Sequence, residues 1–188
     1  MLTMIIGMIL WVDAHMYKRL LPRSRERLNE RIGAGPARGL MSVVILLSVV
    51  LMVMGYRAAP VTQIYAPVAG MGHLNNLLMI VAVILIGMGK SKGRMGTWLR
   101  HPMLTGIIVW AVAHLMVNGD LASIILFGGM AVWAFLQMML INNRETWQRP
   151  TAGPVSGDIK LLIISAVVFI VIVSIHMALG YNPFLGSY

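Results

Sequence analysis

The sequence contains no cysteine and few charged residues. The absence of cysteine excludes disulfide bonds, thiolate catalysis and cysteine-ligated zinc or iron–sulfur sites. Charged residues make up 11% of the 188 residues, whereas a soluble domain carries about 25%. Such a chain cannot cover itself with polar side chains in water, since 59% of it is hydrophobic and its mean hydropathy is +0.82. The composition predicts an integral membrane protein, with the lipid bilayer as its first partner.

Motifs of common enzyme classes are also absent. The sequence has no phosphate-binding P-loop, no glycine-rich dinucleotide fingerprint, no G-x-S-x-G elbow and no H-E-x-x-H zinc motif. Hydrolase, kinase and zinc-protease activities therefore have no support. The net charge of +9 would suit nucleic acid, but the positive residues lie in loops between apolar segments, where membrane topology explains them. We therefore expect no nucleic-acid partner.

Six apolar segments predict an all-α integral membrane bundle of about six transmembrane helices, forming a single domain over residues 1–188. The segments are residues 1–17, 39–56, 74–89, 102–117, 121–141 and 159–179. A membrane-spanning helix needs roughly 17–25 apolar residues, so the first, third and fourth segments are short and are expected to recruit flanking residues. The first segment lacks a preceding Lys or Arg and a small-residue cleavage site, so we interpret it as a retained helix.

The loops between these segments alternate between basic and neutral. The first, third and fifth connections hold 14 of the 15 Lys and Arg residues, and the second holds only Arg57. By the positive-inside rule these three loops lie in the cytoplasm, so both termini are predicted on the non-cytoplasmic side. After Pro22, Leu28 and Ile32 share one helical face and arginines line another. This pattern favours a short amphipathic helix on the membrane surface over a solvated basic linker.

His114 is the most informative of the five histidines, because ionisable residues at membrane depth are costly and are functional candidates by default. It lies in the fourth segment on a stripe with Gly106, Trp110 and Asn118, and this stripe is expected to face the bundle. A neutral imidazole in a dry interior suits a metal or a haem iron. The alternative is a structural histidine bonded to a carbonyl or hydroxyl group of another helix.

The other four histidines are candidates for a second ligand. His15 and His101 are expected near the cytoplasmic face, while His73 and His176 are expected near the outer face, as is His114. By depth alone, His73 or His176 is the easier second ligand for an iron held by His114. Simpler interpretations are a water-exposed helix end for His15 and His73, and a structural role for His176.

A long and unusual block occupies the middle of the chain. It consists of Arg100-His101-Pro102-Met103-Leu104, Trp110-Ala111-Val112-Ala113-His114-Leu115, Asn118-Gly119-Asp120-Leu121-Ala122-Ser123 and Leu126-Phe127-Gly128-Gly129. Upstream are the shorter matches His15, Arg31-Ile32-Gly33, Arg38-Gly39-Leu40 and Gly55-Tyr56. From about Leu10 to Arg144 the chain resembles the NnrU family of bacterial membrane proteins. The resemblance implies a multi-pass protein of the bacterial inner (cytoplasmic) membrane, associated with nitrite and nitric oxide reduction.

The resemblance also implies a cofactor. The NnrU family is similar to the plant 15-cis-zeta-carotene isomerase, which carries haem b on histidines and isomerises a double bond when the iron is reduced. The histidine pattern of that enzyme corresponds here to His15, His73, His101 and His114. The resemblance makes His15 and His114 the leading iron ligands, whereas the depth argument prefers His73 with His114. Arg100 is a candidate for pairing with a haem propionate, or more simply a topology-setting charge.

Three functions remain open. The first is a haem b protein acting in redox sensing, electron transfer or isomerase-like chemistry, with a membrane redox complex or an isoprenoid ligand as partner. The second is a non-catalytic accessory or assembly subunit of a respiratory, denitrifying or photosynthetic membrane complex. The third is isoprenoid chemistry, because Arg100-His101-Pro102 and Gly106 are similar to a cofactor-binding motif of membrane methyltransferases and sterol reductases. The residues after Asn143 lack the acidic segment that completes that site, which disfavours the third function.

Overall fold

The chain folds as a helical bundle, described by a computed structural model over residues 1–67 and 69–184. The long helices are α1 (Leu2–Leu20), α2 (Pro22–Ile32), α3 (Ala34–Arg57), α4 (Met71–Met88), α5 (Pro102–Val117), α7 (Gly129–Arg144) and α8 (Val155–Ala178). Three short segments are η1 (Met95–Thr97), α6 (Leu121–Ser123) and the π-helical η2 (Ile124–Gly128). Within those residues the only extended pairing is an isolated bridge between Gln63 and Asp120. The predicted all-α class is confirmed.

Local sequence explains where the helices begin. Pro22 and Pro102 occupy the first turns of α2 and α5, where a missing N–H removes no helical hydrogen bond. Gly33, with φ of 88°, separates α2 from α3 in a conformation that favours glycine. The side chain of Asp120 accepts the backbone N–H of Ser123 at 3.0 Å and caps α6. The predicted helix after Pro22 is therefore confirmed.

The number of membrane-length helices is lower than the predicted six. Four segments are long and apolar enough to cross a bilayer, namely α3, α4, the continuous rod 121–144 and α8. Helix α5 has 16 residues, which gives about 24 Å of length against a hydrocarbon core of about 30 Å. Helix α1 has 19 residues but includes Asp13, Lys18 and Arg19. All six predicted apolar segments form helices. Two of them are not membrane-length apolar helices, because α5 is too short and α1 carries too many charged residues.

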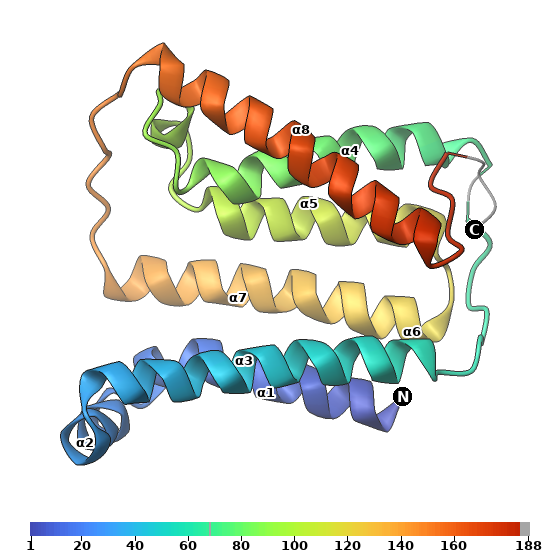
Figure 1. Cartoon of the computed structure of the whole chain (residues 1–188). Helices are drawn as coiled ribbons and strands as arrows, with labels where there is room; N and C mark the ends of the chain where they lie inside the picture. The colour runs from blue at the N-terminus through green and yellow to red at the C-terminus, as the bar shows by residue number, and fades with distance from the viewer. Residues whose placement is uncertain (68, 185–188) are drawn as a thin grey trace.

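Apart from α2, the long helices alternate in direction along the chain (Figure 1). α1, α4 and α7 run one way, whereas α3, α5 and α8 run the other. The start of α1 and the end of α8 therefore lie at one end of the bundle, which we call the neutral end. α2, the α4–α5 connection and the α7–α8 connection lie at the opposite end, which we call the basic end.

Two helix pairs, α1 with α3 and α4 with α5, make the most extensive contacts in the bundle. Gly106 permits the close contact of α5 with α4, since a Cβ there would lie 2.9 Å from the carbonyl oxygen of Ala82 on α4. Gly55 permits the close contact of α3 with α1, since a Cβ there would lie 2.7 Å from Cα of Met4. Gly106 thus faces the bundle, as the predicted stripe requires, and small residues of this kind let helices approach closely. The largest buried cluster joins α3, α5 and α7 and consists of Met52, Leu104, Met130, Trp133 and Ala134, with α1 side chains packed against it.

Candidate functional site

His114 lies in the last turn of α5 and is held in one orientation. Its Nδ1–H donates to the carbonyl oxygen of Trp110 at 2.9 Å. Its ring stacks on Phe127, with the ring centroids 4.4 Å apart and the planes inclined by 21°. Among the residues that the structure describes, Nε2 of His114 has no hydrogen-bond partner. A histidine with one nitrogen bonded to a carbonyl and the other free is arranged as a metal ligand usually is.

An irregular helical turn presents Phe127 to His114. Phe127 lies in η2, whose π-helical backbone is of a kind often found at functional sites. The start of this rod is anchored, because Tyr56 O–H donates to Oγ of Ser123 at 2.8 Å and Ser123 Oγ–H donates to Asp120. Tyr56 belongs to α3, so three helices fix the surroundings of His114.

The loop between α3 and α4 closes the end of α5. The Tyr65 hydroxyl is hydrogen-bonded to the carbonyl oxygens of Leu115 and Asn118. Burial raises the pKa of the Tyr65 phenol, and the negative charge of Asp120 raises it further. The phenol therefore stays protonated at neutral pH and continues to donate. This contact fixes the last turn of α5, which carries His114.

His15 on α1 repeats the arrangement of His114. Its Nδ1–H donates to the carbonyl oxygen of Trp11 at 2.9 Å. Its ring centroid lies 4.1 Å from that of Trp11 and 5.1 Å from that of Trp133 on α7. Nε2 of His15 likewise has no hydrogen-bond partner in the described part of the chain.

Buried polar atoms without partners lie around His15. In residues 1–67 and 69–184 they include Nε1 of Trp11, Nε1 of Trp133 and Oε1 of Gln137. Trp133 and Gln137 are only 4% and 5% exposed. The ring centroids of Trp11 and Trp133 lie 5.3 Å apart. Because α1 and α7 run in the same direction, His15 and Gln137, which each follow one of these tryptophans by four residues, lie at the same height in the bundle. Buried polar groups normally have partners, so this cluster is suited to hold a polar group or water.

The two histidine clusters lie at different levels of the bundle. His15 packs on Trp133 and His114 packs on Phe127. Phe127 and Trp133 are six residues apart on one rod, which corresponds to about 9 Å along its axis. His15 and His114, the pair implied by the family resemblance, therefore contact the same rod at positions six residues apart.

Three other predicted site residues lie away from both clusters. His73 is exposed at the start of α4. At the basic end, Nε2–H of His101 donates to Oδ1 of Asn142 at 2.8 Å, and Arg100 donates to the backbone carbonyl of Glu145. Both groups are thus engaged in joining the α4–α5 connection to the end of α7.

His176 on α8 is one of the two second ligands for His114 that the depth argument named. Its Nδ1–H donates to the carbonyl oxygen of Ile172 at 2.8 Å, as in the other two histidines. It lies within electrostatic range of His114. The described residues contain no cluster of three or more His, Asp or Glu side chains suited to a metal ion. A haem iron, by contrast, takes only one or two protein ligands.

Sequence reasoning missed part of this arrangement. From the sequence, Trp133 and Gln137 are four residues apart and could line a cavity, although packing was favoured, and Trp11 was not identified. A signal was present, because Trp11 with His15 and Trp133 with Gln137 repeat the same aromatic–polar spacing of four residues on two helices.

The comparisons with known proteins give one match. The family model described as "NnrU protein" matches residues 3–183. This match extends past Arg144, where the resemblance seen in the sequence ended, and it includes α8. No curated protein and no solved structure matches the chain.

Proposed function

The chain belongs to the NnrU family, and on that premise we propose that it is a membrane-embedded haem b protein whose iron is bound by His114. The fixed orientation of His114 carries this proposal. The bond from Nδ1–H to the Trp110 carbonyl sets the tautomer that leaves the Nε2 lone pair free for iron. The stacked ring of Phe127 supplies an apolar wall against that side of the site.

His176 is the second ligand in this proposal. It lies within electrostatic range of His114 and has the same bond from Nδ1–H to a backbone carbonyl. His15 is the alternative second ligand, since its ring contacts the same rod about 9 Å further along. The depth argument from the sequence also favours His176 over His15.

Electron transfer or redox sensing is the activity that this arrangement suits best. A bound haem b would supply one-electron redox chemistry. The chain orients the two imidazoles through the carbonyls of Trp110 and Ile172, and it surrounds His114 with aromatic side chains that exclude water. His114 and His176 together would hold the haem iron, which suits electron exchange more than binding of a substrate to iron.

The ligand pair is tested by absorption spectra of purified protein, oxidised and dithionite-reduced. His176→Ala is expected to shift the Soret band toward that of a five-coordinate haem, whereas His15→Ala is expected to leave it in place. The opposite result would assign the second position to His15. A wild-type protein without haem, made with ample haem supply, would contradict the proposal and favour the accessory-subunit function.

We also infer that α1 and α5 cross the membrane with the four longer segments, so that both termini are non-cytoplasmic. The alternating helix directions place the Lys- and Arg-rich connections together at the basic end, and such loops stay in the cytoplasm. The short α5 is largely enclosed by α4 and α7, so its ends need not reach lipid headgroups.

Single-cysteine labelling tests this topology cleanly, because the chain has no cysteine of its own. In spheroplasts, a membrane-impermeant maleimide is expected to label Thr62→Cys in the α3–α4 loop but not Thr146→Cys in the α7–α8 connection. Permeabilised cells should label both variants, which controls for accessibility. Labelling of Thr146→Cys in intact spheroplasts would contradict the assigned orientation.

A further inference from the structure

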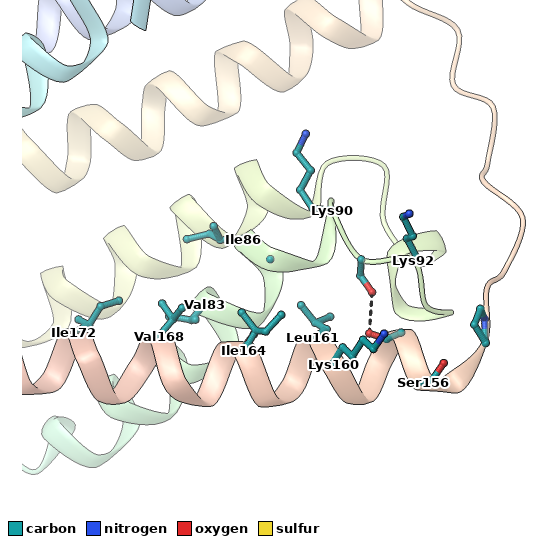
Figure 2. Close-up of a pocket in the computed structure, with 15 residues that line it drawn as sticks. Val83, Ile86, Lys90, Lys92, Ser156, Lys160, Leu161, Ile164, Val168 and Ile172 are labelled. Atoms are coloured by element: carbon teal, nitrogen blue, oxygen red, sulfur yellow. Dashed lines mark hydrogen bonds between the residues drawn. The ribbon is translucent and has the colours of Figure 1, made fainter. Parts of the chain in front are cut away.

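A groove of about 700 Å³ runs between α4 and α8, and its lining ends at Ile172, one helical turn before His176 (Figure 2). Six aliphatic side chains line most of it, namely Val83, Ile86, Leu161, Ile164, Val168 and Ile172. Three lysines lie toward the end of the groove that is close to the α4–α5 connection, namely Lys90, Lys92 and Lys160. The groove is therefore amphipathic along its length.

The apolar part of the groove matches one leaflet of a bilayer in length. Ile172 lies at one end of the labelled lining and Ser156 at the other, and Lys160 lies one turn inside Ser156, twelve residues before Ile172 on α8. This separation corresponds to about 18 Å, and half of the hydrocarbon core is about 15 Å. An acyl chain lying along α8 would thus begin at the lysines and end near the middle of the membrane.

The positive charge at the groove is not neutralised by the protein. Lys90, Lys92 and Lys160 form no ion pair with any described residue. The carboxylate of Asp158 is instead engaged with backbone, since it accepts the N–H groups of Arg94 and Met95 at 3.1 and 2.9 Å. The lysines are therefore available to an anion from outside the chain.

The lysine-bearing loop is held firmly against α8. Ser91 Oγ–H donates to the carbonyl oxygen of Gly157 at 3.4 Å, the bond drawn in Figure 2. A Cβ on Gly157 would lie 2.7 Å from Cα of Gly93, so the two backbones are in close contact. Because this contact fixes the loop, the backbone that carries Lys90 and Lys92 is held against the start of α8, which carries Lys160, before any ligand arrives.

We propose that this groove binds one anionic phospholipid of the cytoplasmic leaflet. Its phosphate lies among Lys90, Lys92 and Lys160, and one acyl chain follows the aliphatic side chains of α4 and α8. Basic pockets between helices on the cytoplasmic side are suited to anionic headgroups. Bound lipid would also extend the contact of α8 with the bundle, since only 11% of its most apolar window is buried. The proposal is independent of haem binding.

Native mass spectrometry of the full chain in detergent, with phosphatidylglycerol or phosphatidylcholine added, tests the proposal. The wild type is expected to retain phosphatidylglycerol preferentially. The variant K90Q/K92Q/K160Q should bind phosphatidylglycerol about a hundredfold more weakly than the wild type. Each lysine contributes about 1 kcal/mol, which corresponds to about fivefold in affinity. The matched control R23Q/R27Q/R31Q removes the same charge from α2 and should keep the preference for phosphatidylglycerol.

A second pair of variants tests the apolar part of the groove. Val168→Trp, which fills the groove, should weaken lipid binding with all lysines present, whereas Val167→Trp should not.

Three results would overturn the proposal. Equal retention of both lipids would show that the lysines do not recognise an anion. An equal loss in the α2 control would show general attraction to a basic surface. Competition by glycerol 3-phosphate at the same concentration as the lipid would show an anion site that makes no use of the acyl chain.

Discussion

His114→Ala is expected to lose most of its haem, whereas His73→Ala is expected to keep it. His114 has a free Nε2 and a ring fixed by Trp110 and Phe127, so its removal takes away the better fixed ligand and leaves only His176 to hold the iron. Loss of a group that merely orients a ligand costs metal sites about 10–100-fold in affinity, so we expect at least a hundredfold here. The ratio of Soret to protein absorbance after gel filtration measures the retained haem.

The control has the same chemistry and lies at the same end of the bundle. His73 is exposed at the start of α4 and contacts neither histidine cluster. The thermal unfolding temperature of both variants without haem shows whether His114→Ala still folds. Full haem retention in a folded His114→Ala variant would remove this residue as the ligand.

Gly55→Ala is expected to destabilise the protein by about 1–3 kcal/mol, the range for overpacking a core. A Cβ at position 55 would lie 2.7 Å from Cα and 2.8 Å from Cβ of Met4, so α1 and α3 must separate to admit it. Met4 is fully buried, so the backbone there has no free space to move into. Thermal unfolding in detergent, followed by circular dichroism, measures the effect.

Gly39→Ala is the matched control on the same helix. Nothing lies within 4 Å of a Cβ at Gly39, and alanine is about 1 kcal/mol better than glycine inside a helix. This variant is therefore expected to be as stable as the wild type or slightly more so. Equal stability of Gly55→Ala and Gly39→Ala would show that α1 and α3 do not approach closely.

The sequence predicts the helices well because lipid leaves the backbone few alternatives. Helix α5 has the predicted bounds, since Pro102 begins it and Asn118-Gly119-Asp120 ends it. Helix α3 begins at Ala34 rather than residue 39, because Pro36 falls in the first turn, where its missing N–H removes no bond. The number of membrane-length helices was less predictable, because a helix that is too short to span the membrane differs in length from one that spans it by only a few residues.

The candidate site was only partly predictable. The depth argument identified His176 as an eligible partner for His114, and the structure places the two within electrostatic range. The separation of His15 from His114 depends on the register of the rod that carries Phe127 and Trp133. That register includes the π-helical turn η2, which has no recognisable sequence signature.

The lysine groove could not be predicted at all. Lys90 lies in the α4–α5 connection and Lys160 lies near the start of α8, 70 residues later. Taken alone, each is explained as a topology-setting charge. Only the contact of Gly93 with Gly157 shows that both line one surface. Sequence periodicity describes single helices, whereas this feature depends on which helices are neighbours.

The haem content of the wild-type protein tests the central claim most directly. The protein would be purified in detergent from cells supplied with a haem precursor, and haem b would be measured as its pyridine complex against total protein. We expect a single haem b per chain, with reduced spectra typical of two histidine ligands. A folded, monodisperse protein that contains no haem under these conditions would contradict the account.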